Sequence, residues 1–268
     1  MNYISSVLET NLKRSSCSFI PFITAGYPDI NTTIDALSIL DREGADIIEL
    51  GVPYSDALAD GIVIQNASKV AISNDVNIDK IIDMLSKIKI QTPIIIFSYY
   101  NPILSKGVKK FISEIAVLGV KGLVIPDLPL EESNYILSLC LSCDIELVFF
   151  VAPTSSKTRI LSIVDKSPGC LYLVSSTGVT GLRDSLDDNI SYIANEVLVN
   201  TTKMIMLGFG ISSPNQIGDI VKNHNSISGV VVGTAIIRIL DKCLDDQNFD
   251  LSNELGSFCR LMKSATFI

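Results

Sequence analysis

Two carboxylates lie within one short stretch of the chain, and their settings differ. Glu49 occupies the penultimate position of an apolar run, Asp46–Leu50, with the composition of a buried strand. Burying a carboxylate costs free energy unless it is paired or functional, and a partly apolar setting raises its pKa. Asp60 follows in a loop beside Gly61, where we expect it near solvent. Two carboxyl groups in unlike environments can divide acid and base duties.

Each of these residues also has a purely structural interpretation. A backbone group or a lysine could hold Glu49, and Asp60 could simply be solvated. Asp56, in the same loop, is of a type that favours turns. Tyr172 lies inside another apolar run, where its ring either faces a site or packs against helices. The residues alone leave these alternatives open.

Other common catalytic chemistries lack their residues in this chain. The one histidine, His224, lies in a polar stretch that predicts a surface loop, so neither a Ser-His-Asp triad nor a histidine-rich metal site is available. Cys140 and Cys143 form a single CxxC with no histidine nearby. We therefore expect no metal, and free thiols in a reducing compartment. Proton transfer then falls to carboxylates, tyrosine or lysine.

Glycine motifs late in the chain predict an anion site. Gly210 lies in a GFG motif before serines and Pro214, a pattern that favours a helix start. Gly233 and Thr234 open a second predicted helix directly after an apolar run. Free amides and the helix dipole at such starts favour an anion, so the two motifs together predict a phosphate site. A third glycine-rich stretch, 175–185, predicts a loop that wraps a ligand.

Short apolar runs alternate with amphipathic stretches along the chain. Continuous apolar runs suit strands that are covered on both faces, as in a parallel sheet. The predicted strands are Phe19–Thr24, Asp46–Leu50, Pro93–Ser98, Gly122–Ile125, Glu146–Val151, Cys170–Val174, Lys203–Leu207 and Gly229–Val232. The predicted helices are Thr32–Glu43, Ile78–Ile88, Phe111–Leu118, Glu131–Leu141, Lys157–Val164, Asn189–Leu198, Pro214–Val221 and Ala235–Leu240.

This alternation predicts an α/β fold, a closed (β/α)8 TIM barrel, in preference to an open sheet. Extra helices are expected at Ser5–Lys13 and Leu251–Lys263. No linker composition divides the chain, so we expect a single domain over residues 1–268. In this fold the loops that follow the strands form the active face.

Composition excludes two classes of partner. The net charge is −8 and there is no basic tract, which argues against nucleic acid. No apolar run is long enough to cross a bilayer, which argues against a membrane protein. The first residues lack a signal or transit pattern. We therefore expect a protein of the cytoplasm or of the plastid stroma.

Six segments, in order, resemble the tryptophan synthase alpha chain family over essentially the whole length. They are PFITAGYPD, ELGVPYSDALADG, IPDLPLEES, SSTGVTG, GFGISSP and VVGTAII. The resemblance implies a carbon–carbon lyase that splits indole-3-glycerol phosphate into indole and D-glyceraldehyde 3-phosphate. It also implies that the indole passes to a β subunit, which condenses it with L-serine in L-tryptophan biosynthesis.

The resemblance assigns roles residue by residue. It makes Glu49 the principal acid/base residue, Asp60 the second catalytic carboxylate and Tyr172 an auxiliary group. It places the phosphate on Gly181, Gly210, Gly233 and Thr234. It places the substrate pocket at Phe22, Phe97, Tyr99, Val124, Thr180 and Phe209, with Phe97 and Thr234 standing where the family commonly has leucine and serine.

The resemblance also implies a partner. The expected assembly is an α2β2 tetramer with the tryptophan synthase β subunit. No cofactor is expected in this chain, and pyridoxal phosphate is expected in that partner. Ala57 stands where the family commonly has proline, in the loop that meets β, which puts this contact in question. The alternatives are a stand-alone indole-3-glycerol-phosphate lyase and a non-catalytic regulatory subunit of the same fold.

Overall fold

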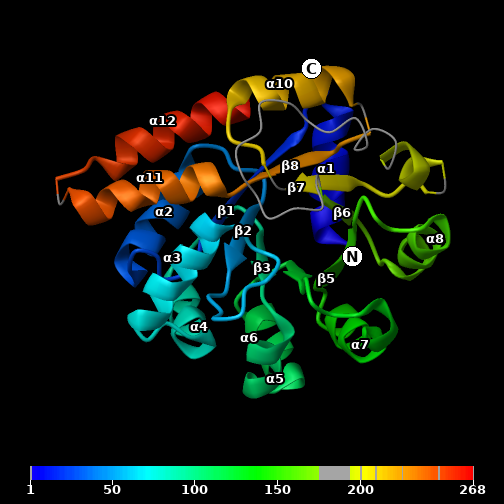
Figure 1. The fold of residues 1–268 in the computed structure, drawn as a ribbon, viewed down its shortest axis with the longest axis horizontal. Helices are drawn as coiled ribbons and strands as arrows, with labels where there is room; N and C mark the ends of the chain where they lie inside the picture. The colour runs from blue at the N-terminus through cyan, green and yellow to red at the C-terminus, as the bar shows by residue number, and fades with distance from the viewer. Residues whose placement is uncertain are drawn as a thin grey trace.

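Parallel strands close into a barrel at the centre of the molecule, and helices surround it (Figure 1). The computed structural model describes residues 2–174, 194–199, 201–208, 210–224, 226–246 and 248–267. Within them each strand pairs in parallel with the next, and the last pairs with the first. The strands are β1 (Ser18–Thr24), β2 (Ile48–Gly51), β3 (Ile94–Phe97), β4 (Gly122–Val124), β5 (Glu146–Val151), β6 (Leu171–Val174), β7 (Ile205–Gly208) and β8 (Gly229–Val232).

The predicted (β/α)8 TIM barrel is therefore confirmed. Each predicted strand is present, with ends displaced by no more than two residues. Nearly every residue of these strands is buried, because one face of each strand lines the interior of the barrel and the other meets a helix. Continuous burial is the reason that unbroken apolar runs identified them.

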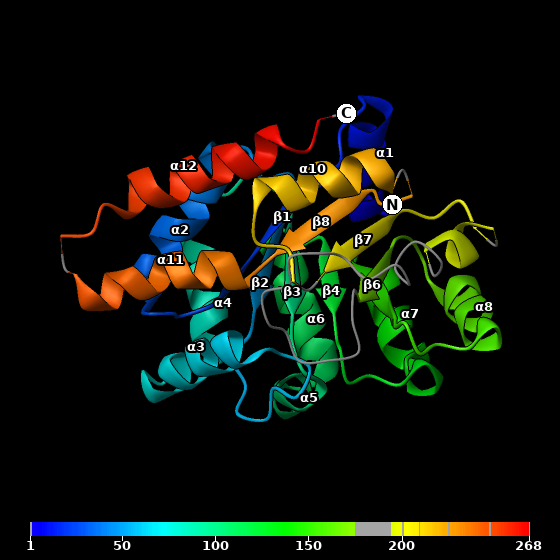
Figure 2. The same ribbon diagram turned by 45° about the horizontal axis from the view of Figure 1, so that its top comes forward.

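The helices lie in a ring around the strands, as the turned view also shows (Figure 2). They are α1 (Tyr3–Lys13), α2 (Ile30–Arg42), α3 (Ile62–Ser73), α4 (Ile78–Lys87), α5 (Tyr100–Lys106), α6 (Val108–Val117), α7 (Asn134–Ser142), α8 (Lys157–Lys166), α10 (Pro214–Asn223), α11 (Thr234–Asp245) and α12 (Leu251–Ser264). The predicted helix Glu131–Leu141 starts instead as a 3-10 turn, Leu130–Glu132, before α7. Of the predicted helix Asn189–Leu198, the described residues 194–198 are helical.

The sequence analysis missed α3 and α5. The buried residues of α3 are Ala67, Ser68 and Ala71, which are small or polar and leave a weak apolar period. In α5 a single apolar residue, Ile103, is buried in a helix of seven residues. Tertiary contacts, and not a strong amphipathic pattern, therefore hold both helices.

The apolar core has two layers. The larger one lies between the strands and the ring of helices. The smaller one fills the barrel interior, where Ile4 and Leu8 of α1 lie at the amino ends of the strands. A Cβ atom on Gly229 would come within 2.9 Å of the Leu8 side chain, so this glycine allows α1 to seat against the barrel. The opposite, carboxyl end is left for a site.

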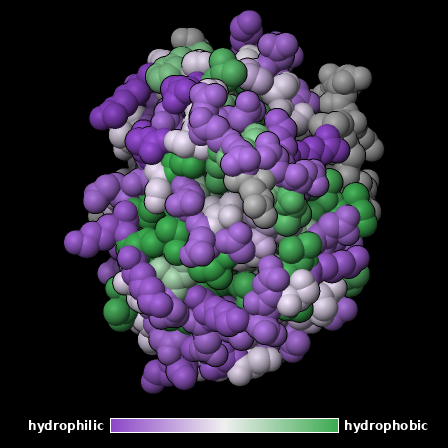
Figure 3. Space-filling view, turned by 90° about the vertical axis from the view of Figure 1, so that its left-hand side faces the viewer, coloured by the Kyte–Doolittle hydropathy of each residue, from purple (hydrophilic) through white to green (hydrophobic). Residues whose placement is uncertain are grey.

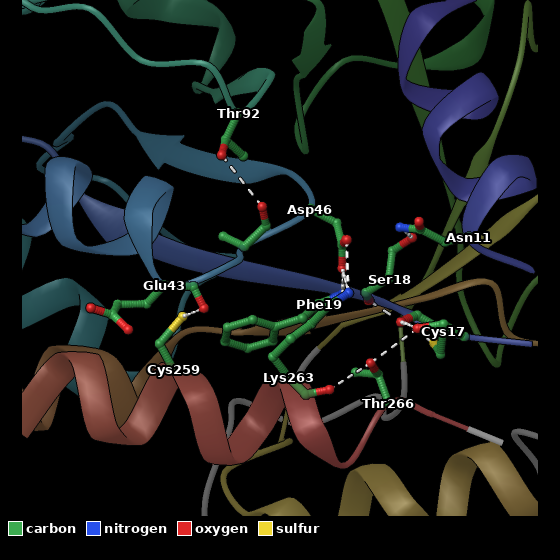
Figure 4. Close-up of polar contacts among 12 residues, drawn as sticks. Asn11, Cys17, Ser18, Phe19, Glu43, Asp46, Thr92, Cys259, Lys263 and Thr266 are labelled. Carbon is green, nitrogen blue, oxygen red and sulfur yellow. Dashed lines mark hydrogen bonds and ion pairs between the residues drawn. The ribbon is translucent and has the colours of Figure 1, made fainter. Parts of the chain in front are cut away.

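Polar contacts anchor the C-terminal helix to the amino ends of the strands (Figure 4). The Asp46 carboxylate accepts a hydrogen bond from the Phe19 amide at 2.7 Å and pairs with Lys263 of α12 at 2.6 Å. The Cys17 amide donates to the Thr266 carbonyl at 2.9 Å. These contacts bring the two ends of the chain together on the face opposite the carboxyl ends of the strands.

The outer faces of the helices are mostly polar, as one side of the molecule shows (Figure 3). Within the described ranges, no helix combines the length and the apolar character that crossing a membrane requires. The apolar faces of the helices are instead turned toward the barrel.

Candidate active site

A pocket of about 430 Å³ of empty space, counting its open mouth, lies at the carboxyl ends of the strands. This is the face on which barrels of this kind carry their sites. Its walls combine carboxyl groups, aromatic rings and glycines. The lining residues are Phe22, Glu49, Asp60, Ile64, Phe97, Tyr172, Gly210, Ile211, Val231, Gly233 and Thr234.

Glu49 is placed inside the barrel by β2. It pairs in register with Phe22 of β1 and Ile95 of β3, and its exposed fraction is 1 %. Its Oε2 lies 3.5 Å from the Tyr172 hydroxyl, and its Oε1 has no hydrogen-bond partner among the described residues. Burial, followed by the nearby charge of Asp60, raises the pKa of this carboxyl to about 8. The sequence analysis expected Glu49 to have a raised pKa, which would let it give and take protons near neutral pH. The pKa of about 8 agrees with that expectation.

Tyr172, on β6, directs its hydroxyl toward Glu49 and packs its ring on Phe150, with centroids 4.8 Å apart. The sequence left open whether this side chain faced a site or packed; it does both. Burial raises the pKa of Tyr172 well above its usual value, so the phenol remains protonated and able to donate.

Asp60 is buried, with an exposed fraction of 6 %, which corrects the expectation that it lies near solvent. Its backbone folds inward because Gln65 of α3 donates from Nε2 to the Asp60 carbonyl at 2.9 Å. Its carboxylate Oδ2 accepts from the Tyr99 hydroxyl at 3.1 Å. Burial raises the pKa of Asp60 to about 6, and the Tyr99 hydrogen bond opposes that rise.

The two carboxyl groups therefore differ in charge near neutral pH. Glu49, with its pKa at about 8, is mostly protonated at pH 7, whereas Asp60, with its pKa at about 6, is mostly ionised. The predicted contrast between a buried and a solvent-exposed carboxyl group is wrong, because both residues are buried, and the two differ instead in their hydrogen-bond partners. A proton donor and a negative charge thus line one pocket.

The anion end of the pocket lies at α11. Gly233 is the N-cap of this helix, and it has no side chain to occupy the amides of the first turn. A Cβ atom there would lie 3.2 Å from the Phe22 ring, so glycine keeps this approach open. Thr234 begins α11 as the sequence predicted. The amides and the dipole of the helix start favour a phosphate here.

At the start of α10, by contrast, side chains already accept hydrogen bonds from the backbone amides. Ser213 is its N-cap, with Pro214 at the first position, as the sequence indicated. The Oε1 atom of Gln216 accepts from the amides of Ser212 and Ser213 at 2.8 and 3.1 Å. Gly210, with φ +83°, also lines the pocket, and its lack of a side chain allows its backbone to lie close to a ligand. Of the two helix starts that follow the late glycine motifs, that of α11 therefore has no side-chain cap.

The apolar wall is aromatic. Phe22 and Phe97 meet edge to face with centroids 5.9 Å apart, and both line the pocket. Tyr99 lies behind Asp60 and does not itself line the pocket. Val124 is fully buried in the barrel interior below these rings. A flat apolar ring system fits between such side chains.

Three of the predicted site residues, Thr180, Gly181 and Phe209, lie outside the described residues. The same holds for the glycine-rich stretch 175–185. Their predicted contributions to the phosphate site and the pocket stay predictions.

The structure adds lining residues that the sequence analysis did not single out. Ile64 lies on α3, a helix that was itself missed, and Ile211 and Val231 lie beside two glycines that were identified. Side chains alternate between the two faces of a strand, so Val231, two residues before Gly233, lies on the same face as that glycine. This alternation could have identified Val231 from the sequence. The contact between Tyr99 and Asp60 joins residues 39 positions apart and carries no local sequence signal.

No group of metal-ligating side chains gathers within the described ranges. The six cysteines, including Cys140 and Cys143, are free thiols. His224 follows the last residue of α10 as its C-cap, in the predicted loop, and is partly buried. None of these residues lines the pocket.

Comparisons with known proteins identify the family of this chain. The family model of the tryptophan synthase alpha chain matches residues 8–266. The tryptophan synthase alpha chain of Gracilaria tenuistipitata var. liui is 55% identical, with 98% of this chain and 96% of that protein covered. That of Antithamnion sp. is 53% identical, with both chains fully covered. A solved structure of Mycobacterium tuberculosis tryptophan synthase superposes with a TM-score of 0.89 at 27% identity, covering 99% of this chain and 98% of that one.

The family resemblance that the sequence suggested is thereby confirmed over nearly the whole chain. The family's reaction is the cleavage of indole-3-glycerol phosphate to indole and glyceraldehyde 3-phosphate, within tryptophan biosynthesis. The barrel, its mouth and the full-length similarity together show that this chain belongs to the tryptophan synthase alpha chain family.

Proposed function

We propose that Glu49 and Asp60 share the chemistry of this cleavage, with Glu49 as the proton-transfer group and Asp60 as the fixed negative charge. The observation that carries this proposal is the presence in one pocket of two buried carboxyl groups with different hydrogen-bond partners, of which burial raises the pKa of Glu49 further than that of Asp60. Indole is a poor carbanion, so the bond from its C3 atom to the side chain needs an electron sink before it breaks.

Glu49 supplies that sink by protonation. The Glu49 carboxylic acid gives its proton to C3 of the indole ring, which produces a cationic indolenine. The resulting carboxylate then takes the proton of the adjacent side-chain hydroxyl. The oxygen forms the aldehyde carbonyl, the C–C bond breaks, and its electron pair returns to the ring. Glu49 ends protonated again, so a single residue with a pKa at about 8 serves both steps.

Asp60 and the helix terminus position and stabilise the substrate. The Asp60 carboxylate accepts from the ring N–H and opposes the positive charge that develops there. The phosphate binds at Gly233 and Thr234, on the amides at the start of α11. Because the phosphate is remote from the reacting bond, its binding energy orients that bond. Tyr172 donates toward Glu49 and aligns the carboxyl group after it has lost its proton.

Glu49→Gln is expected to abolish cleavage while leaving substrate binding intact, because the amide has the same shape but no acidic proton. We expect kcat to fall at least about 10³-fold, in line with the loss of an essential general acid and base. The measurement is spectroscopic detection of indole released from indole-3-glycerol phosphate. Ordinary turnover in the glutamine variant would show that the role of Glu49 is wrong.

The rate is expected to depend on pH in a bell shape. Below about pH 6 Asp60 becomes protonated and its negative charge is lost, so kcat/KM falls on the acid side. Above about pH 8 Glu49 loses the proton that it must donate, so kcat/KM falls on the alkaline side as well. A profile of kcat/KM between pH 5 and 10 measures both limbs. A rate that keeps rising above pH 9 contradicts a protonated Glu49 as the starting state.

Gly233→Asp is expected to weaken substrate binding, because its Cβ meets the Phe22 ring and its charge repels a phosphate at the start of α11. We expect KM to rise at least about tenfold, as loss of a favourable charged contact would. Gly218→Asp is the matched control, since it adds the same charge on α10 where a Cβ meets no atom within 4 Å. Equal KM values for the two variants would place the phosphate elsewhere.

We further propose that the chain assembles with a tryptophan synthase β subunit as an α2β2 tetramer, and that indole passes to it for condensation with L-serine. The loop beside the pocket mouth supports this assembly because it exposes apolar side chains: Leu58 is 85 % exposed and Ile62 59 %. Ala57, the departure from the family pattern, is buried, so the substitution changes the inner side of this loop and leaves Leu58 outward. Pyridoxal phosphate would belong to the β subunit.

Leu58→Asp is expected to weaken that assembly, because it places a charge in an apolar contact. Sedimentation of this chain mixed with a β subunit should show a tetramer for the wild type and a dissociation constant about tenfold or more higher for the variant. Leu261→Asp, on α12 and 57 % exposed, is the control that should assemble normally. If the wild-type chain stays separate and releases indole unaided, it is a stand-alone lyase.

The cellular compartment also remains a proposal, and the relatives support one. Chains similar to this one occur in red algae and in cyanobacteria such as Synechocystis sp., at 44% identity. The plastid stroma or the bacterial cytoplasm is therefore the compartment that we propose.

A further inference from the structure

We infer that Tyr99 is a positioning residue, whose hydroxyl fixes the Asp60 carboxylate so that one of its oxygens stays directed at the ring N–H of the substrate. This inference rests on the proposed function of Asp60. It adds a residue that makes no contact with the substrate and that acts through a single hydrogen bond.

The direction of that hydrogen bond is fixed by the atoms around it. The Tyr99 oxygen lies 2.9 Å from the amide nitrogen of Ala59 and 3.1 Å from Oδ2 of Asp60. An amide N–H can only donate, so the phenol oxygen must accept from Ala59. The single phenol proton is then left for Asp60. The Asp60 oxygen at this contact must accept, which favours an ionised carboxylate.

The phenol is held in place by its own surroundings. Tyr99 follows β3, is 3 % exposed, and packs its ring against Tyr54 and Phe97 at centroid distances of 5.3 and 6.2 Å. The loop that carries Asp60 is therefore tied to the end of a barrel strand. Because Oδ2 is engaged by the phenol, Oδ1 is the oxygen left for the pocket.

The two phenol hydroxyls of the site lie at different distances from their carboxyl partners. Tyr99 lies 3.1 Å from Asp60, whereas Tyr172 lies 3.5 Å from Glu49. The shorter contact stabilises an ionised carboxylate, and the longer one leaves Glu49 free to hold a proton. The separation of charge between the two carboxyl groups thus has a structural cause besides burial.

Other charges near Asp60 do not replace this contact. The titratable groups that interact electrostatically with Asp60 or with its phenol partner are Glu49 of β2 and Tyr172 of β6, whose pKa values the Asp60 charge raises, and Asp127 beyond β4, which acts on Tyr99. None is a cation. Within the described residues Tyr99 is the hydrogen-bond donor that favours ionised Asp60.

Tyr99→Phe tests the inference, because it removes the hydroxyl and keeps the ring. Loss of a hydrogen bond to the ionised form raises the pKa of Asp60, so the acid limb of kcat/KM should move upward by about one pH unit. We expect kcat at neutral pH to fall about tenfold and KM to change less than about twofold, since the phosphate contacts are untouched. Tyr54→Phe, which loses a hydroxyl that does not touch Asp60, should match the wild type.

A double-mutant cycle separates this inference from the proposed function. In an Asp60→Asn background, Tyr99→Phe should lower kcat by a further factor of less than about two, because the hydroxyl acts through the carboxylate. An equal loss in both backgrounds, or an acid limb that does not move, overturns the positioning role. If Asp60→Asn itself turns over normally, the proposed function fails instead. Thermal unfolding of each variant checks that the fold is retained.

Discussion

The proposed chemistry depends on one constraint, the burial of the Glu49 carboxyl inside the barrel, at the pocket near the carboxyl ends of the strands. The surrounding strands remove water from it, and that loss of solvation raises the pKa of Glu49 to about 8. An exposed glutamate would be ionised at neutral pH and could not donate a proton to carbon. The continuous apolar strands that close the barrel are thus also the reason that Glu49 retains the proton that the proposed mechanism needs.

Burial in the same pocket also disfavours the ionised form of Asp60. A second buried carboxyl would also become neutral unless something stabilised its charge, and its charge in turn raises the pKa of Glu49. The Tyr99 hydroxyl provides that stabilisation, and Gln65 holds the backbone on which it acts. At the start of α11, where we propose that the phosphate binds, the described lining residues are Gly233 and Thr234, so the proposed contacts are backbone amides. This explains how a chain of net charge −8 can bind an anionic substrate.

Much of this arrangement could be predicted from the sequence, for physical reasons. Each strand is buried on both faces, so most of its length is apolar, and Glu49 stands out as a carboxyl group near the carboxyl end of its strand. Glycine, serine and proline at the starts of α10 and α11 act through local backbone preferences. What could not be predicted depends on distant contacts. The burial of Asp60 follows from Tyr99, which lies just after another strand, and from α3, whose buried face is made of alanine and serine.

Carboxyl groups at the two ends of the barrel have opposite effects on the stability of the fold. At the carboxyl ends, holding Glu49 neutral costs stability once the pH rises above 4.5, the ordinary pKa of a glutamate, because the unfolded chain ionises there and the folded one does not until about pH 8. At the amino ends, Asp46 is satisfied by the Phe19 amide and by Lys263, and Glu146 accepts from the amides of Ser5 and Cys170 at 3.0 and 2.7 Å. Buried carboxylates at this end are fully partnered, and they tie the terminal helices to the strands. The unpartnered Glu49 oxygen is tolerated at the mouth because the rest of the barrel is anchored at the face where no chemistry takes place.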